Sequence, residues 1–421
     1  MLWSLCNRRM LICVLIGFSS GLPLFVGSTL VQAWLHEKGV GLEEIGLLNL
    51  TGLPYTWKFA WAPLLDRYSL PFLGRRRGWA LCMQVALFFC IAAFGLLEPE
   101  RSMPSVVALA CAVAFFSATQ DVVLDAYRRE LLPDRELGFG TSLHINAYRL
   151  AALVPGSLAL ILADHLPWSW VYLIVAMFMA VGILTSLFAG EAAALIHPPT
   201  TLTEAVVGPF REFLARGDRS NALLIVLFML LYKLGDAMAS ALLIPFYLEV
   251  GFSMTVIGTV AKGAALPAFV IGSLVGGLTI AKAGINRSLW IFGVLQLVST
   301  LGFVVLARSG PDVWLLGGVV SFENLSAGLG ASAFLAFMSR ATNRRFTATQ
   351  YALFSSLVAL PRTLASASTG YLAEGLGYSG FFLTCALIAL PGLWLLTRVA
   401  PWSRAGLAAQ QPVHAPEQPS S

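Results

Sequence analysis

Twelve long apolar segments constrain this chain more than any other feature of its sequence. A helix needs about 20 mostly apolar residues to cross the hydrocarbon core of a bilayer. Charged residues make up 12% of the chain, whereas a soluble domain carries about 25%. The sequence therefore predicts an all-α membrane protein with twelve transmembrane helices. These span residues 10–35, 44–65, 79–97, 104–127, 139–163, 168–189, 221–248, 254–280, 289–307, 313–338, 348–373 and 380–400.

Motifs for other kinds of chemistry are missing from the sequence. It has no Gly-Lys-Ser/Thr loop for nucleotide phosphates, no His-Glu-x-x-His pair and no nucleophile elbow. The six Cys lie in or beside apolar runs without metal-ligand spacing, and the net charge of +5 does not favour nucleic acid. We expect no enzymatic activity, no metal, no other cofactor and no nucleic-acid partner.

Lys and Arg are distributed unevenly between the two sides of the predicted membrane. With the N-terminus in the cytosol, nineteen of the 27 Lys and Arg lie on the cytosolic side. Lys38, Arg101 and Arg308 lie on the other side, and the remaining five lie inside helices. Since cytosolic loops carry an excess of Lys and Arg, both termini are predicted to be cytosolic.

The chain divides into two predicted halves. Residues 190–220 form the longest internal loop, a predicted cytosolic linker between six-helix bundles at 1–189 and 221–400. Residues 401–421 are rich in Pro, Gln, Ser and Ala, which predicts a disordered cytosolic tail.

The two halves carry a weak repeat. Gly39-Val-Gly-Leu-Glu-Glu-Ile-Gly46 opens the second segment, and Gly251-Phe-Ser-Met-Thr-Val-Ile-Gly258 opens the eighth with the same spacing. Arg149 in the fifth segment has a counterpart in Arg362 of the eleventh. Parallel six-helix repeats are the build of major facilitator transporters, whose substrate site lies near the midplane between the halves. The repeat predicts this fold, with two pseudo-symmetric bundles.

Nine charged residues fall inside the predicted helices, where charge is costly and usually functional. None lies on the third, sixth, ninth or twelfth segment, which are the outer support helices of the major facilitator fold. The five basic and four acidic groups predict a cavity that becomes electropositive when some acids are protonated, and this favours an anionic substrate. They are Lys58, Asp121, Asp125, Arg149, Lys233, Asp236, Lys262, Glu323 and Arg362.

The spacing of the acidic groups leaves several roles open. Asp121 and Asp125 are four residues apart on one helix face, so Asp121 could serve substrate or proton while Asp125 locks a cytosolic gate. Lys233 and Asp236 are three apart and can pair, either structurally or as working groups. Glu323 has no opposite charge in its own helix, so it could cycle a proton with a partner from another helix.

One loop motif resembles a known family. Ala62-Pro-Leu-Leu-Asp-Arg67 and Gly74-Arg-Arg-Arg-Gly-Trp79 resemble the signature between helices two and three of major facilitator proteins. An insertion, Tyr68 to Leu73, separates the two parts, and this extended form is similar to that of AmpG-type muropeptide permeases. Further matches are Phe18-Ser-Ser-Gly-Leu-Pro23, Gln32-Ala-Trp34, Tyr55-Thr-Trp-Lys-Phe-Ala-Trp-Ala-Pro63, and Ser117-Ala-Thr-Gln-Asp121 with Asp125-Ala126.

The resemblance implies a proton-driven importer in the inner membrane of a Gram-negative bacterium. Its substrates would be N-acetylglucosamine–anhydro-N-acetylmuramic acid with or without a peptide, taken from periplasm to cytosol for peptidoglycan recycling. A link to β-lactamase induction, and so to β-lactam resistance, is also implied. The carboxylates of the peptide suit the electropositive cavity, and a monomer is expected.

Three groups of residues are predicted to carry this function. The substrate-binding group is Tyr55, Lys58, Gln120, Asp121, Arg149, Lys233, Lys262 and Arg362. The proton-coupling group is Asp121, Asp236 and Glu323. The cytosolic gate is Asp66, Arg67, Arg75, Arg76, Arg77, Asp125, Arg128 and Arg129, with the loop cluster closing against Asp125 and the end of the fourth helix.

Two alternatives stay open at this point. The same fold could carry another anionic solute, such as an acyl-coenzyme A, a sugar phosphate or a siderophore. The protein could also sense wall fragments in the membrane without moving them.

Overall fold

The computed structural model describes residues 7–41, 48–190, 199–215 and 219–402, and in these residues every regular element is a helix. The predicted tail 401–421 lies outside the described residues except for its first two positions. Ten helices of the described chain are long and apolar enough to cross a membrane. The broken second segment and the first part of the last helix complete the twelve predicted segments, so the predicted all-α fold class is confirmed.

The first half begins with a kinked helix and a segmented one, followed by four further membrane segments. Its elements are α2 (Arg8–Phe25), η1 (Val26–Leu30), α3 (Val31–Glu37), η2 (Leu48–Gly52), α5 (Leu53–Trp57), η3 (Lys58–Ala60), α6 (Ala62–Arg67), α7 (Arg75–Phe94), α8 (Pro99–Leu131), α9 (Leu137–Ala151), η4 (Val154–Leu158), α10 (Ala159–Ala163), α11 (Trp168–Met177) and α12 (Ala180–Phe188).

The second half follows a separate helix, α13 (Leu202–Ala215), in the predicted linker. Its last helix contains a break at Gly377, which separates the eleventh and twelfth segments. Gly377 has a φ of 66°, which glycine adopts without strain because it has no Cβ. The elements are α14 (Arg219–Leu231), α15 (Leu234–Ala241), α16 (Leu243–Val250), α17 (Met254–Val256), η5 (Ile257–Ala261), α18 (Lys262–Ala283), α19 (Ile285–Ser309), α20 (Val313–Ala341), η6 (Arg344–Phe346) and α21 (Thr347–Val399).

Several helices extend beyond the segments predicted from apolar content. The third was predicted to start at residue 79, but α7 starts at Arg75. The fourth was predicted over 104–127, but α8 runs from Pro99 to Leu131. The extra turns carry charged residues, and the helix continues through them because its backbone hydrogen bonds do not depend on apolar side chains. Hydropathy alone therefore makes these helices too short at their ends.

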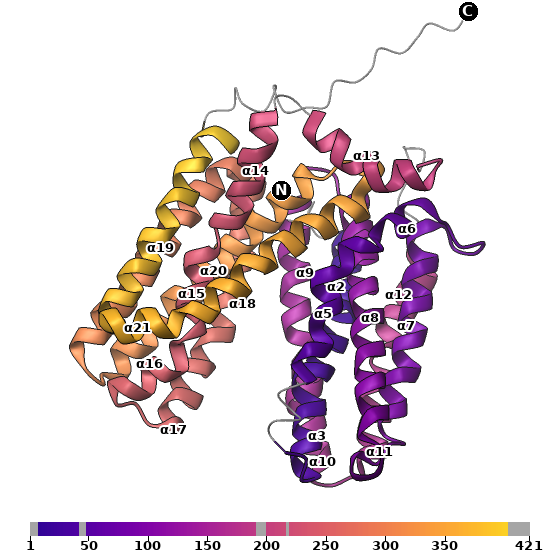
Figure 1. Ribbon diagram of the computed structural model, residues 1–421, viewed down its shortest axis with the longest axis horizontal. Coiled ribbons are helices and arrows are strands. Elements are labelled where there is room, and N and C mark those ends of the chain that lie inside the picture. Colours follow the sequence, from indigo (N-terminus) through magenta and orange to yellow (C-terminus); the bar gives the residue numbers. More distant parts are fainter. Residues whose placement is uncertain (1–6, 42–47, 191–198, 216–218, 403–421) are drawn as a thin grey trace, which may run out of the picture.

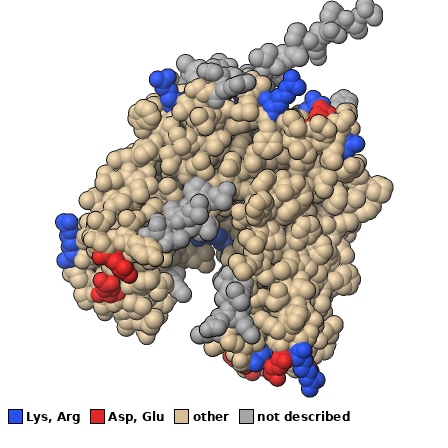
Figure 2. All heavy atoms as spheres, viewed as in Figure 1, with Lys and Arg blue, Asp and Glu red and all other residues tan. Residues whose placement is uncertain are grey.

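The two halves stand side by side and meet at one end (Figure 1). We call this the linker end, because α13 lies across it, and the opposite end, with α3, α11 and α17, the far end. The space-filling view shows a cleft between the halves that opens at the far end (Figure 2). This arrangement leaves the facing helices of the two halves accessible from the far end.

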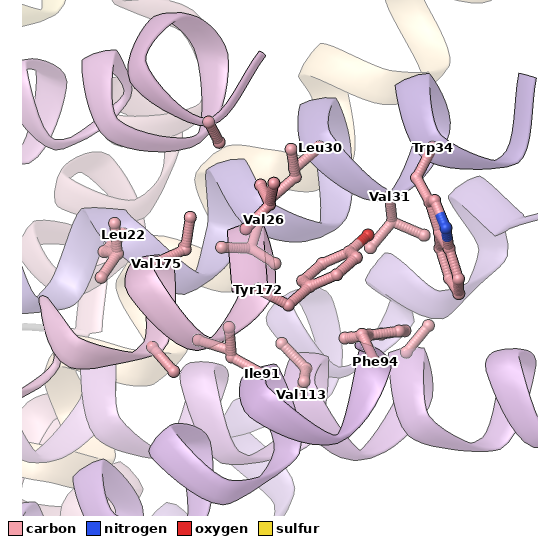
Figure 3. Close-up of a cluster of buried hydrophobic side chains, with 14 of the residues drawn as sticks. Leu22, Val26, Leu30, Val31, Trp34, Ile91, Phe94, Val113, Tyr172 and Val175 are labelled. Carbon is pink, nitrogen blue, oxygen red and sulfur yellow. The ribbon is translucent and has the colours of Figure 1, made fainter. Parts of the chain in front are cut away.

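Each half has its own apolar core. In the first half, side chains from α2, η1, α3, α7, α8 and α11 pack around Tyr172 (Figure 3). The Tyr172 ring stacks on Phe94 and meets Trp34 edge-on, with centroids 5.4 and 5.3 Å apart. The second half packs Phe228, Tyr232 and Phe334 in one cluster and Phe246, Phe303 and Phe382 in another. A smaller cluster combines Ile12 and Leu65 of the first half with Ala348 and Ala352 of the second.

Glycines bring the backbones of α18 and α20 into contact. A Cβ added to Gly272 would lie 2.1 Å from the Leu325 carbonyl oxygen, and one added to Gly328 would lie 2.4 Å from that of Phe269. Small residues are favoured between membrane helices because they permit this close approach.

Replacing Gly328 with valine should therefore destabilise the second half. Overpacking of this kind costs about 1–3 kcal/mol. The measurement is the Tm of the purified protein in detergent, and Gly328→Val should lower it. Gly318→Val is the matched control, because Gly318 lies in the same helix with nothing within 4 Å of its added Cβ. Equal Tm values for the two variants would contradict the packing described here.

Candidate transport cavity and gate

The seventh membrane segment is broken at the point where it carries charge. α14 ends at Leu231 and α15 begins at Leu234, and Lys233 lies between them with φ −106° and ψ 2°. Lys233 Nζ lies 3.3 Å from Asp236 Oδ2, so the predicted pairing of these two residues is confirmed. Discontinuous helices expose backbone groups as well as side chains, and in transporters they often form the binding site.

Gln296 is a partner of Lys233 that sequence reasoning missed. Lys233 Nζ donates to Gln296 Oε1 at 2.8 Å, and Gln296 is itself buried on α19. Gly330 of α20 leaves room for the contact, since its added Cβ would lie 2.7 Å from that oxygen. Gln296 is uncharged and sits on the ninth segment, so a search for charges on cavity helices passes over it.

Glu323 of α20 belongs to the same cluster as Lys233, Asp236 and Gln296. It is 8% exposed, and its carboxyl accepts a hydrogen bond from Asn324 Nδ2 at 3.0 Å. The Asp236 carboxyl, Lys233 and Arg149 are all within electrostatic range of Glu323. Glu323 therefore has partners from other helices, as its isolation in sequence predicted. Two adjacent carboxyls with one ammonium form a group that can share and release a proton.

A second charged cluster lies in the first half. The Asp121 carboxylate on α8 accepts a hydrogen bond from the Ser20 hydroxyl of α2. Lys58, a buried residue of η3, and Tyr55 of α5 are both within electrostatic range of Asp121. The structure thus brings three predicted residues, Tyr55, Lys58 and Asp121, to one place.

Gln120, which the sequence assigns to the substrate-binding group, contacts α2 in this conformation. Its side chain is fully buried, and its Nε2 donates to the Ser19 carbonyl of α2 at 2.8 Å. Neighbouring residues of a helix point about 100° apart, so Gln120 and Asp121 cannot face the same direction. Gln120 joins α8 to α2 instead of lining the cleft.

Arg149 reaches across from the first half to the second. It is exposed at the cleft, and its guanidinium carbon lies 3.3 Å from the ring centroid of Phe269 on α18. A cation over an aromatic face is attracted to the ring, and this contact joins α9 to α18. The side chains of Lys262 and Arg362 lie outside the described part of the structure, so their predicted roles stay predictions.

The predicted gate contains a buried ionic network at the linker end. Arg76 is 1% exposed and Asp66 is not exposed at all. Arg76 Nη2 lies 2.7 Å from Asp66 Oδ1 and 2.6 Å from Glu130 Oε1, and Arg75 Nη2 lies 3.2 Å from the same Glu130 oxygen. The network joins α6, α7 and the end of α8 within the first half.

Asp66 also binds the second half. Its Oδ1 accepts from the Ala348 N–H at 3.1 Å, and its Oδ2 accepts from the Thr349 N–H at 2.8 Å and from the Thr349 hydroxyl at 2.7 Å. These groups lie in the first turn of α21, where N–H groups lack partners inside the helix and the helix dipole favours negative charge. One carboxylate therefore binds groups of both halves.

Two further sets of contacts cross the same end. Arg128 Nη2 donates to the Tyr351 hydroxyl of α21 at 3.0 Å. On the other side of the molecule, α9 meets α18 and α20 through buried side chains: Ser273 Oγ donates to Asn146 Oδ1 at 2.6 Å, and Ser142 Oγ donates to Ser332 Oγ at 3.0 Å. The linker end is thus closed on two sides while the far end is open.

The gate differs from the prediction in its partners. The loop cluster was expected to close against Asp125, but the acidic partner at the end of α8 is Glu130, which sequence reasoning missed. Asp125 pairs within its own helix with Arg128, at 2.9 Å, because a residue three positions away is nearer than the loop. Glu130 follows Arg128-Arg129 directly, and this adjacency was the available signal.

Three further predicted gate arginines bind groups of the first half or of the linker. Arg67 donates to the Thr200 carbonyl before α13. Arg77 donates to the carbonyls of Ser186 and Leu187 at the end of α12, at 2.8 and 2.6 Å. Arg129 pairs with the exposed Asp134 at 3.1 Å.

Replacing Asp66 with asparagine should loosen the closed end. A hydrogen bond to a charged group contributes about 1.5–3 kcal/mol, so a loss of about 2 kcal/mol corresponds to roughly thirtyfold faster opening of the α21 amides. Hydrogen exchange of a peptide covering residues 347–351 would measure it. The control is Asp134→Asn, which removes an exposed ion pair at the same end. Unchanged exchange in Asp66→Asn would show that the carboxylate does not hold the halves together.

Comparisons with known proteins agree with this architecture. Residues 9–366 match the Major Facilitator Superfamily. A crystal structure of FucP, a transporter of this superfamily in the outward conformation, superposes with a TM-score of 0.70 at 14% identity, covering 94% of this chain and 100% of FucP. At that identity the likeness shows the fold alone.

Two curated relatives match over nearly the whole chain. An uncharacterised protein of Haemophilus influenzae is 45% identical over 404 residues, which cover 94% of this chain and 95% of that protein. The anhydromuropeptide permease of Escherichia coli is 42% identical over 390 residues, which cover 92% of this chain and 79% of the permease. The chain therefore belongs to the major facilitator superfamily and, within it, to the family of the Escherichia coli anhydromuropeptide permease.

Proposed function

We propose that this protein is a proton-driven permease that imports anhydromuropeptides for peptidoglycan recycling. The observation that carries the proposal is the 42% identity to the anhydromuropeptide permease of Escherichia coli, a protein whose name states that substrate. The relatives are permeases, so the chain is a transporter and not an enzyme. Its inner-membrane location and any contribution to β-lactam resistance form part of the proposal.

The linker end is the cytosolic end in this proposal. In the topology predicted from the sequence, nineteen of the 27 Lys and Arg fall on the side of the linker, as the positive-inside rule requires of a cytosolic side. The cleft then opens to the periplasm. The conformation is one that receives substrate from outside while the Asp66 contacts keep the cytosolic end closed.

Substrate would bind between the two charged clusters. Arg149 is exposed and contacts Phe269 of the second half, and Lys58 and Lys233 are further cations of the first and second half. These cations suit the carboxylates of a muropeptide, since charge inside a membrane protein needs a partner. Lys262 and Arg362 are proposed as further cations of this site, and Tyr55 as an aromatic face for the sugar.

Proton coupling would use the carboxyl groups of the two clusters. The Glu323–Asp236 pair shares a proton while Lys233 neutralises the remaining charge. A substrate carboxylate that draws Lys233 away would leave two carboxyls without their cation, which favours proton uptake by the pair. Asp121, with Lys58 as counter-charge, is proposed to play the same part in the first half.

Uptake of labelled anhydromuropeptide by proteoliposomes tests the function directly. We expect accumulation under an imposed pH gradient, because one proton moved down a gradient of one pH unit supplies about 1.4 kcal/mol, enough for roughly tenfold accumulation. Uptake that persists when the gradient is collapsed would rule out proton coupling. Binding without counterflow would instead indicate a sensor, and competition by sugar phosphates, acyl-coenzyme A or siderophores would indicate another substrate.

Glu323→Gln should separate transport from coupling. Glutamine keeps the shape and the acceptor oxygen but cannot exchange a proton, so gradient-driven accumulation should fall from roughly tenfold to none while counterflow continues. Glu98→Gln, at an exposed far-end ion pair with Arg101, is the matched control and should behave as the parent. Normal accumulation by Glu323→Gln would remove Glu323 from the proton path.

A further inference from the structure

The insertion between the two parts of the loop motif has no role in the gate. It begins where α6 ends at Arg67, and two of its large side chains are exposed, Tyr68 at 48% and Phe72 at 44%. The backbone is nevertheless held in place. Trp79 Nε1 donates to the Tyr68 carbonyl at 2.8 Å, and the Phe72 carbonyl lies 2.7 Å from where a Cβ of Gly78 would be. An ordered loop therefore presents apolar side chains outward.

The linker helix α13 has three distinct flanks. One flank is buried against the protein through Ala205, Pro209 and Phe213. A second is polar and tied to the second half: Glu204 pairs with Arg345, and Glu212 accepts from Asn343 at 2.8 Å and from Gln350 at 2.6 Å. The third is apolar and has no protein over it in the described structure, with exposures between 42% and 52%. It comprises Leu202, Val206, Val207, Phe210 and Leu214.

The order of these flanks around the helix shows which way the apolar flank faces. At 100° per residue, the buried flank lies between the polar flank and the exposed apolar flank. Because the polar flank binds η6 and α21 of the second half, the apolar flank is turned away from that half. α13 itself lies across the linker end above α6 (Figure 1).

The two segments are joined to one another. Arg67, the residue before the insertion, donates to the Thr200 carbonyl just before α13, and its guanidinium carbon lies 5.2 Å from the centre of the Tyr68 ring. The insertion and the apolar flank of α13 thus belong to one corner of the first half. Leu64 on α6, itself exposed within a membrane segment, extends the apolar surface toward the hydrocarbon.

We propose that this corner is an interfacial collar, with Tyr68, Phe72 and the apolar flank of α13 seated at the headgroup–acyl boundary of the leaflet at the linker end. Three observations favour lipid as the occupant. The collar starts where a membrane segment ends, it continues the exposed apolar surface at Leu64, and its Tyr68 lies beside Arg67 and Trp79. Aromatic side chains are enriched at this depth, and amphipathic helices bind there through an apolar face beside basic residues.

The collar would hold one half in place during transport. α13 contacts both halves, through α6 on one side and Arg345, Asn343 and Gln350 on the other. A helix anchored at the membrane surface can keep its depth while the two bundles rock against each other. The proposal depends on the position of these residues and not on the identity of the substrate.

Photo-crosslinking tests the occupant. p-Benzoylphenylalanine replaces Phe210 in one variant and Phe72 in another, and the protein is irradiated in Escherichia coli membranes and analysed by mass spectrometry. The matched control places the same residue at Arg211, one position along α13 and exposed on its polar side. We expect phospholipid adducts at Phe210 and Phe72 in at least fivefold excess over Arg211.

Two results would overturn the collar. Adducts with protein in place of phospholipid at both positions would identify a protein-docking surface. Equal phospholipid yields at Phe210 and Arg211 would show that α13 has no lipid-facing flank. Uptake by the same variants is measured in parallel, so that retained transport shows each variant is folded.

Discussion

One buried carboxylate, Asp66, joins the two halves of this transporter at its closed end. Asp66 receives the Arg76 guanidinium from its own half and two backbone N–H groups and a hydroxyl from the first turn of α21. A buried charge is stable only when it is paired and fully hydrogen-bonded. When α21 departs, Arg76 and Glu130 still satisfy each other within the first half. The contact can therefore open without leaving an uncompensated arginine behind.

The charged residues of the membrane segments are also grouped by half. Asp121 and Lys58 form one cluster and Glu323, Asp236 and Lys233 the other, so each half carries its own carboxyl and its own ammonium. Each half thus retains neutralised charge whichever end of the cleft is open. Each carboxyl group therefore has a cation of its own half nearby, which offsets part of the cost of burying its charge.

Contacts along one helix were predictable, and contacts between helices were much less so. The Lys233–Asp236 pair follows from a spacing of three residues, and the confirmed helices follow from hydropathy. Gln296 was missed because it is uncharged and on a support helix, and the contact of Gln120 with Ser19 was not foreseen because the rotation of α8 depends on its packing against α2. Glu130 was overlooked although it adjoins the gate arginines, since Asp125 offered the same charge.

By itself, the sequence determined that this protein is an all-helical membrane transporter and which charged residues fall in its apolar segments. Apolar length, periodicity and the sorting of Lys and Arg are local properties, and they act before any helix meets another. Only the tertiary structure decided the partners: Asp66 with α21, Arg149 with Phe269, and Gln296 with Lys233. These contacts depend on how closely the backbones approach, as at Gly272 and Gly328, and that distance is a property of packing between segments far apart in the chain.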